Sequence, residues 1–135
     1  MKKRVLFLCS SNAARSQMAE ALLRQMAGVQ FEVFSAGNQP TGVHPSALHA
    51  LHELDVDPTG LRSKAVSEFR GQQFDYVITL CDKARQECET LPGAGEYLAW
   101  DFEDPVTSSE PMPFLRVAKA LRERIKLFVL INSKG

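Results

Sequence analysis

The sequence has no apolar run long enough to cross a membrane as a helix. Its longest apolar runs are residues 5–9 and 127–131, whereas a membrane-spanning helix needs roughly 20 such residues. The basic residues 1–4 (MKKR) look like the front of a signal peptide, but the apolar stretch behind them is shorter than the usual length of about 7–15 residues. We therefore expect a cytoplasmic protein with no membrane partner.

An excess of charge of either sign is also missing. The chain has 16 basic and 16 acidic residues and a formal net charge of zero. Without a basic tail or stripe it lacks the electrostatic footprint of a nucleic-acid-binding protein. Its 135 residues, 44% of them hydrophobic, suit one compact domain. We expect a single domain over residues 1–135, and a monomer.

Cysteine is scarce, and its number and spacing exclude two common uses. The chain has three cysteines, Cys9, Cys81 and Cys88. An odd count argues against a structural disulfide framework. No CxxC pair or neighbouring histidine suggests a metal site, so we expect no bound metal. In a cytosolic protein such cysteines are either ordinary buried residues or catalytic ones.

The hydrophobic pattern predicts strands alternating with helices. Short apolar or alternating segments predict strands at residues 4–8, 31–36, 74–80 and 96–100. Helical spacing predicts helices at residues 15–26, 45–54 and 114–128, with a short helix over 82–89. This order is typical of an α/β protein with right-handed crossovers. We predict a small flavodoxin-like three-layer sandwich around a four-stranded parallel sheet.

Chemically active residues follow several of the predicted strands. Cys9 comes directly after the first strand, Cys81 after the third, and Asp104 a few residues beyond the fourth. Ligands of such sheets bind at the carboxyl ends of the strands. We therefore expect these three side chains to meet at one edge of the sheet. Asp101 and Glu103 are acidic neighbours, so it stays open which of these carboxylates is the active one.

The segment between the first strand and the first helix has the form C-x5-R-S. It consists of Cys9, Ser10, Ser11, Asn12, Ala13, Ala14, Arg15 and Ser16. Small residues allow successive backbone N–H groups to point inward and form an anion-binding nest at a helix N-terminus. Arg15 adds a planar fork that matches two oxygens of a tetrahedral anion.

The same positive surroundings favour the thiolate form of Cys9, which is the nucleophilic form. Ser16 is expected to donate a hydrogen bond to the sulfur, and Asn12 to brace the loop with its side-chain amide. The alternative is that Cys9 is an ordinary buried cysteine at a strand end. Ser11 stands where a glycine would be more permissive.

Residues 9–16 and the following QMAE resemble the start of the low-molecular-weight tyrosine phosphatase superfamily. The resemblance continues through SAG at residues 35–37, TLCD at residues 79–82, and Asp104-Pro105, and so covers nearly the whole chain. It implies the phosphatase-I type of fold. Within the superfamily, the spacing of the cysteines is similar to that of the thioredoxin-coupled arsenate reductases.

The resemblance implies a role for each site residue. Cys9 would attack arsenate held by Arg15 and the loop amides, and Asp104 would protonate the leaving oxygen. Cys81 would then resolve the Cys9–arsenic adduct, leaving a transient Cys9–Cys81 disulfide. Cys88 would attack Cys81, giving a Cys81–Cys88 disulfide for thioredoxin to reduce. No bound cofactor is implied.

The spacing of the last two cysteines predicts a conformational change. Cys81 and Cys88 are seven positions apart, about 10.5 Å along a regular helix. The Cα atoms of a disulfide usually lie within about 7 Å. We therefore expect residues 81–88 to be locally unstable and to rearrange during turnover.

One position departs from some members of the superfamily, which hold a potassium ion beside the loop. Asn12, Glu20 and Ser35 match three of the four potassium ligands, but Lys64 stands where those members have an acidic residue. An ammonium group there would disfavour a cation and supply its charge, which predicts no potassium dependence. The alternative is that Lys64 points into solvent.

Three other functions remain open. The first is a phosphatase acting on phosphotyrosine or small phosphate esters, although no Tyr or Trp follows Asp104-Pro105 to hold an aromatic ring. The second is an arsenate reductase that uses glutaredoxin or glutathione in place of thioredoxin. The third is an oxyanion sensor that binds without turnover.

Overall fold

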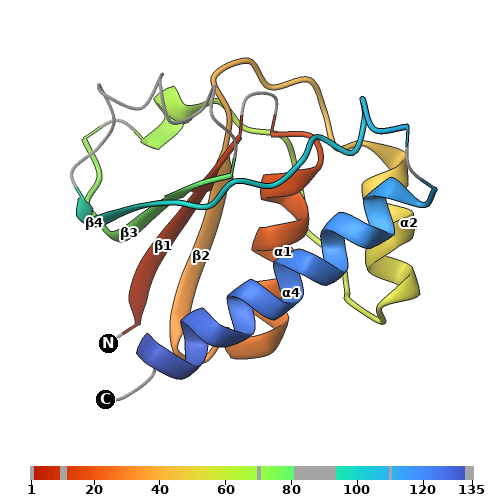
Figure 1. The fold of residues 1–135 in the computed structure, drawn as a ribbon. Helices are drawn as coiled ribbons and strands as arrows, with labels where there is room; N and C mark the ends of the chain where they lie inside the picture. Colours follow the sequence, from red (N-terminus) through yellow and green to blue (C-terminus); the bar gives the residue numbers. More distant parts are fainter. Residues whose placement is uncertain (1, 10–11, 70, 81–93, 110, 133–135) are drawn as a thin grey trace.

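The fold is built around a four-stranded parallel sheet. The computed structural model describes residues 2–9, 12–69, 71–80, 94–109 and 111–132. The strands are β1 (Lys3–Leu8), β2 (Phe31–Ala36), β3 (Phe74–Thr79) and β4 (Ala94–Ala99). They lie in the order β2-β1-β3-β4, and all three pairs are parallel (Figure 1). The predicted α/β class with a four-stranded parallel sheet is confirmed.

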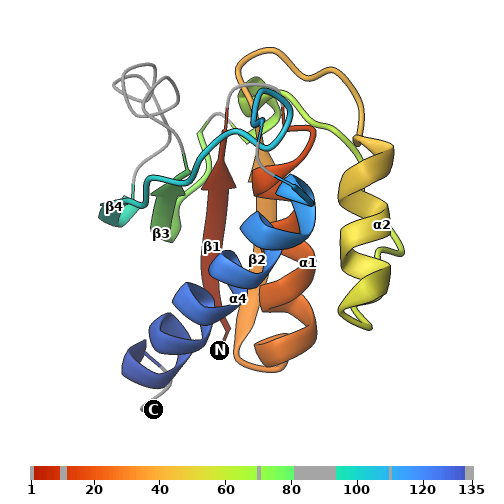
Figure 2. The same cartoon turned by 45° about the vertical axis from the view of Figure 1, so that its right-hand side comes forward.

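Three α-helices gather on one side of the sheet. They are α1 (Arg15–Ala27), α2 (Pro45–Glu53) and α4 (Pro113–Asn132). Helix α4 crosses α1, and α2 contacts both of them farther from the sheet (Figure 2). Phe31 of β2 packs on Phe128 of α4, with ring centroids 5.5 Å apart.

The opposite face of the sheet is covered by a short 3-10 helix, η1 (Val66–Phe69). Side chains three positions apart on a strand point to opposite faces, so Phe34 faces away from the side that Phe31 shares with α4. Phe69 packs edge-on against Phe34 and Phe74, with centroids 5.6 and 5.8 Å away. Among the described residues, η1 is the helical part of this second layer.

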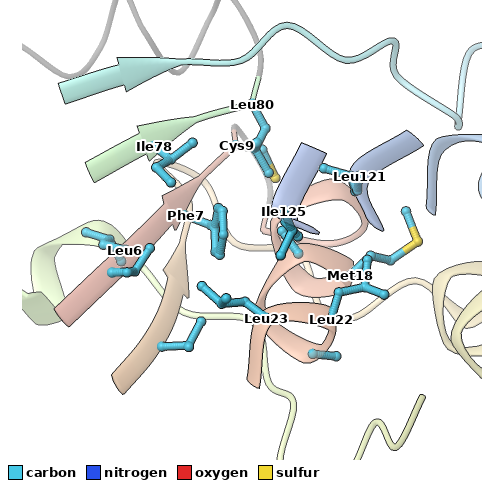
Figure 3. Packing of buried hydrophobic residues seen from close by; sticks show 14 of the residues in the cluster. Leu6, Phe7, Cys9, Met18, Leu22, Leu23, Ile78, Leu80, Leu121 and Ile125 are labelled. Atoms are coloured by element: carbon cyan, nitrogen blue, oxygen red, sulfur yellow. The ribbon is translucent and has the colours of Figure 1, made fainter. Parts of the chain in front are cut away.

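The core explains why β1 is central. Val5, Leu6 and Phe7 are fully buried, as expected for a strand covered on both faces. The core continues through α1, β3 and α4 and extends to the sulfur of Cys9 (Figure 3). Leu80, just after β3, donates its backbone N–H to the carbonyl of Leu8 at 2.8 Å. The carboxyl ends of β1 and β3 are thereby held side by side.

The predicted elements differ from the observed ones mainly at their ends. Helix α4 continues to Asn132, four residues beyond the predicted end, and η1 was not predicted. The short helix predicted over residues 82–89 lies outside the described residues. Within the part of the chain that the structure describes, no helix combines the length and apolarity needed to span a membrane.

Candidate active site

The loop after β1 leads directly into the N-terminus of α1. Cys9 is 3% exposed, and its backbone N–H donates to the carbonyl of Ala36 at 3.3 Å. Ala14 occupies the N-cap of α1, and the first turn of the helix has no acidic residue. The free N–H groups and the positive end of the helix dipole are therefore not occupied by a carboxylate of that turn, as an anion site requires. Ser10 and Ser11 lie outside the described residues.

A chain of hydrogen bonds ends on the sulfur of Cys9. The Oγ of Ser16 lies 2.8 Å from Cys9 Sγ, and the Nδ2 of Asn12 lies 2.7 Å from the same Oγ. All three residues are at most 3% exposed. An amide nitrogen can only donate, so Ser16 Oγ accepts from Asn12. The single hydroxyl hydrogen of Ser16 is then available for the sulfur, where it stabilises a thiolate.

The orientation of the Asn12 amide is fixed by a backbone donor. The N–H of Lys64 donates to Asn12 Oδ1 at 2.7 Å. Because a backbone N–H cannot accept, the atom facing it must be the amide oxygen, which places Nδ2 toward Ser16. Asn12 also has a left-handed backbone, with φ of 49°, a conformation that asparagine adopts more readily than most residues. Both side-chain roles expected from the sequence agree with this geometry.

Arg15, the first residue of α1, connects the loop to the segment after β4. Its Nη1 donates to the carbonyl of Phe102 at 2.8 Å, and its Nη2 lies 4.0 Å from Asp104 Oδ2. The Arg15 side chain is 12% exposed and that of Asp104 is 42% exposed. The structure thus brings Arg15 and Asp104 together at the carboxyl edge of the sheet, the edge at which Asp104 was expected.

Asp104 is held in a turn and separated from its acidic neighbour. Its Oδ1 accepts the backbone N–H of Val106 at 3.0 Å. Glu103 instead pairs with Arg116 of α4, with Glu103 Oε1 2.9 Å from Nε. Glu103 is therefore engaged elsewhere, and Asp104 is the carboxylate beside Arg15. Its partly exposed position suits a group that exchanges a proton with a bound oxyanion.

Lys64 points into the protein and not into solvent. Its side chain is 9% exposed, and Nζ lies 3.4 Å from Glu20 Oε1 and 2.7 Å from the carbonyl of Arg62. Ser35 Oγ donates to the same Glu20 oxygen, and Arg24 pairs with the other carboxylate oxygen at 2.6 Å. The ammonium group thus lies beside two of the residues, Glu20 and Ser35, that match potassium ligands in some relatives.

This placement predicts that the protein gains nothing from potassium. An ammonium so close to the Glu20 carboxylate repels a second cation. Replacing KCl by NaCl or choline chloride at equal ionic strength should leave catalytic rate and melting temperature unchanged within error. Magnesium-free buffers and a single chloride concentration serve as controls. A rate or melting temperature that rises specifically with potassium would contradict the prediction.

The segment that carries Lys64 is anchored at the surface by Arg62. Arg62 pairs with exposed Glu68 at 2.9 Å. The hydrogen bond from Arg62, with its positive charge, lowers the pKa of Glu68 below its usual value. The pair joins the segment before Lys64 to η1 at the protein surface.

Sequence reasoning missed three contributors to the site. They are the amide of Gln17, the backbone N–H of Lys64 and the carbonyl of Phe102. Backbone groups leave no signal in a sequence, and Gln17 adjoins the C-x5-R-S motif without being part of it. Cys81 and Cys88 lie outside the described residues. Among the residues described, no group of three His, Cys, Asp or Glu side chains is placed to hold a metal.

The chain is similar to known proteins over nearly its whole length. Residues 4–133 match the family described as low molecular weight phosphotyrosine protein phosphatase. An arsenate reductase of Bacillus cereus is 39% identical over 132 residues, covering 98% of each chain. A solved arsenate reductase in a phosphate-binding state has a TM-score of 0.80 at 27% identity, covering 97% of this chain and 98% of its own. A thioredoxin-dependent arsenate reductase of Corynebacterium glutamicum has a TM-score of 0.77 at 33% identity, covering 99% of this chain and 64% of its own.

Proposed function

The chain belongs to the low molecular weight phosphotyrosine protein phosphatase family, and we propose that within it the protein is an arsenate reductase that serves arsenic detoxification. The main support for this proposal is the position of the Cys9 sulfur, which lies 2.8 Å from the Ser16 hydroxyl at the N-terminus of α1. We infer that a thiolate in this position faces an oxyanion held by Arg15 and the N-terminus of α1. Curated relatives that are 39% identical over nearly the whole chain are arsenate reductases, which supports arsenate as the substrate.

The first chemical step uses Cys9, Arg15 and Asp104, of which Arg15 and Asp104 lie 4.0 Å apart. The Cys9 thiolate attacks arsenic and forms an S–As bond. Asp104 donates a proton to a hydroxyl group of arsenate, and the As–O bond breaks so that this oxygen leaves as water. Arg15 and the N–H groups at the start of α1 balance the charge of the remaining oxygens. Arsenic is still in the +5 state at the end of this step.

Reduction follows when a second thiolate attacks the sulfur of Cys9. Cys81 forms an S–S bond with Cys9 as the S–As bond breaks, and the bonding pair stays on arsenic, which leaves as arsenite in the +3 state. Cys88 then attacks Cys81 and releases Cys9 as a thiolate. The two electrons finally come from a dithiol, for which thioredoxin is the proposed donor. We place the reaction in a cytoplasmic, monomeric enzyme.

Phosphate ester hydrolysis is the second candidate, because phosphate and arsenate share shape and charge. The two reactions have a common first step and differ in whether water or Cys81 resolves the adduct. After Asp104, the described residues 105–109 contain no aromatic side chain to hold a tyrosine ring. Phosphatase activity is therefore proposed only as a weak side reaction toward small esters.

The decisive assay couples arsenate reduction to NADPH oxidation, with thioredoxin and its reductase or glutaredoxin with glutathione. We expect NADPH oxidation with arsenate and thioredoxin, and loss of steady turnover in Cys88→Ser. Phosphate should compete with arsenate, because both occupy the same loop. Normal turnover of Cys88→Ser would remove the three-cysteine relay. Turnover with glutaredoxin alone would change the electron donor, and no turnover with either would overturn the proposed activity.

A further inference from the structure

Among the residues that the structure describes, Gln17 is the one beside the loop whose side chain is buried, polar and incompletely bonded. It is 0% exposed and follows Ser16 in the first turn of α1. Its Nε2 lies 2.8 Å from Asn12 Oδ1, 3.0 Å from the backbone carbonyl of Asn12 and 2.7 Å from the carbonyl of Arg62. Within the described part of the chain, its Oε1 is the one buried side-chain nitrogen or oxygen without a hydrogen-bond partner.

The orientation of this amide follows from its neighbours. All three atoms around Nε2 are acceptors, so the reversed amide would place oxygen against three oxygens. The observed orientation instead leaves Oε1 unpaired, which is unfavourable in a buried position. An apolar side chain of similar size would fill the space without that cost. The donors of the amide, and not its volume, therefore distinguish glutamine at this position.

Those donors act on Asn12 at two points. The bond to Oδ1 adds to the bond from the Lys64 N–H and keeps the other end of the amide, Nδ2, directed at Ser16. The bond to the Asn12 carbonyl holds a residue whose backbone is left-handed, with φ of 49°. The bond to Arg62 keeps the segment that carries Lys64 against α1. Gln17 thus supports Asn12 directly, through these two bonds, and indirectly, by holding the segment whose Lys64 N–H bonds to Asn12.

We propose that Gln17 is a positioning residue that sets the reactivity of Cys9 through Asn12 and Ser16. When its donors are absent, Asn12 keeps the bond from the Lys64 N–H but loses its other support, so its Nδ2 commits the Ser16 hydroxyl to the sulfur less firmly. A cysteine whose thiolate loses such a donor ionises at higher pH. The proposal rests on Cys9 being the nucleophile of the proposed function, but not on arsenate being the substrate.

The test follows the alkylation of Cys9 by iodoacetamide as a function of pH. Trypsin places Cys9 alone in residues 5–15, so mass spectrometry reports this sulfur separately from Cys81 and Cys88. In Gln17→Met, which keeps the volume and removes the donors, we expect the midpoint of Cys9 alkylation to rise by about one pH unit. The phosphate concentration that halves the alkylation rate should rise about fivefold.

A matched control lies on the same helix. Gln25 is exposed and bonds through both ends of its amide, to the carbonyl of Asp55 at 2.9 Å and to the N–H of Asp57 at 2.9 Å, and neither bond involves the loop. Gln25→Met should lower stability without changing the alkylation midpoint. Gln17→Leu, which removes the donors without adding a charge, should raise the midpoint as Gln17→Met does, and it provides the test if Gln17→Met does not fold.

An unchanged midpoint in a folded Gln17 variant would overturn the proposal and leave Gln17 a structural residue. An equal shift in Gln25→Met would do the same, because it would show a general effect of weakening α1. These outcomes do not depend on reduction of arsenate. Wild-type Cys9 could prove to be reactive, and phosphate could protect it from alkylation, while arsenate is not reduced. The proposed function would then be wrong, but the alkylation midpoints would still test the role of Gln17.

Discussion

Cys9→Ser should abolish both arsenate reduction and aryl phosphate hydrolysis, with a loss of about 10⁴-fold or more in turnover rate. A serine hydroxyl remains protonated at neutral pH, and the loop donors that stabilise a thiolate do not ionise it. The substitution is nearly isosteric at a site 3% exposed, so the fold should be preserved. The loss should therefore be chemical and not structural.

Phosphate binding distinguishes a chemical loss of activity in Cys9→Ser from a structural one. Arg15 and the start of α1 are unchanged in Cys9→Ser, so calorimetry should find a phosphate affinity within a few-fold of the wild type. Circular dichroism and the melting temperature provide the control for folding. Residual reduction above about 1% of the wild-type rate would point to a different nucleophile. Loss of phosphate binding together with activity would instead mean that the loop itself had collapsed.

Much of the fold was predictable because its signals are local. A fully apolar run predicted central strand β1, and helical spacing predicted α1, α2 and α4 to within a few residues. The strand-to-helix alternation then placed the loop and Asp104 at the same edge, where Arg15 and Asp104 are found 4.0 Å apart. Helix η1 was missed because four residues carry no periodicity.

The support behind the loop was less predictable because it depends on distant contacts. Lys64 donates to Asn12 across 52 positions and pairs with Glu20 across 44. Only the family resemblance placed Lys64 near a cation site. The sequence left open whether its side chain points into the protein or into solvent. The structure decides the matter, because the Lys64 side chain is 9% exposed and its Nζ lies 3.4 Å from the buried Glu20 carboxylate.

This support also contributes charge to the site. Glu20 is contacted by two cations, Lys64 and Arg24, so the three side chains together carry one net positive charge. Arg24 is 44% exposed and therefore screened by solvent, whereas Lys64 is buried. The buried pair is thus close to neutral, and attraction of the oxyanion is left mainly to Arg15 and the N-terminus of α1. The cluster fixes the position of the loop more than it adds to the field.

Cys81→Ser should separate reduction from hydrolysis more sharply than any other change. Without this thiol nothing attacks the sulfur of the Cys9–arsenic adduct, and the adduct returns to arsenate by hydrolysis. We expect no arsenite above background, measured by chromatography with elemental mass spectrometry. Hydrolysis of p-nitrophenyl phosphate should stay within about twofold of the wild type, because water resolves the phosphorylated Cys9.

Cys88→Ser is the matched control for that experiment, because it removes a thiol that acts one step later. It should release one equivalent of arsenite per enzyme and then stop with a Cys9–Cys81 disulfide. Trypsin would recover that disulfide as residues 5–15 joined to residues 71–83. One equivalent of arsenite from Cys81→Ser would assign the resolving role to another thiol. Equal loss of hydrolysis and reduction in Cys81→Ser would mean that the substitution damages the shared first step, and the proposed division between water and Cys81 would then be wrong.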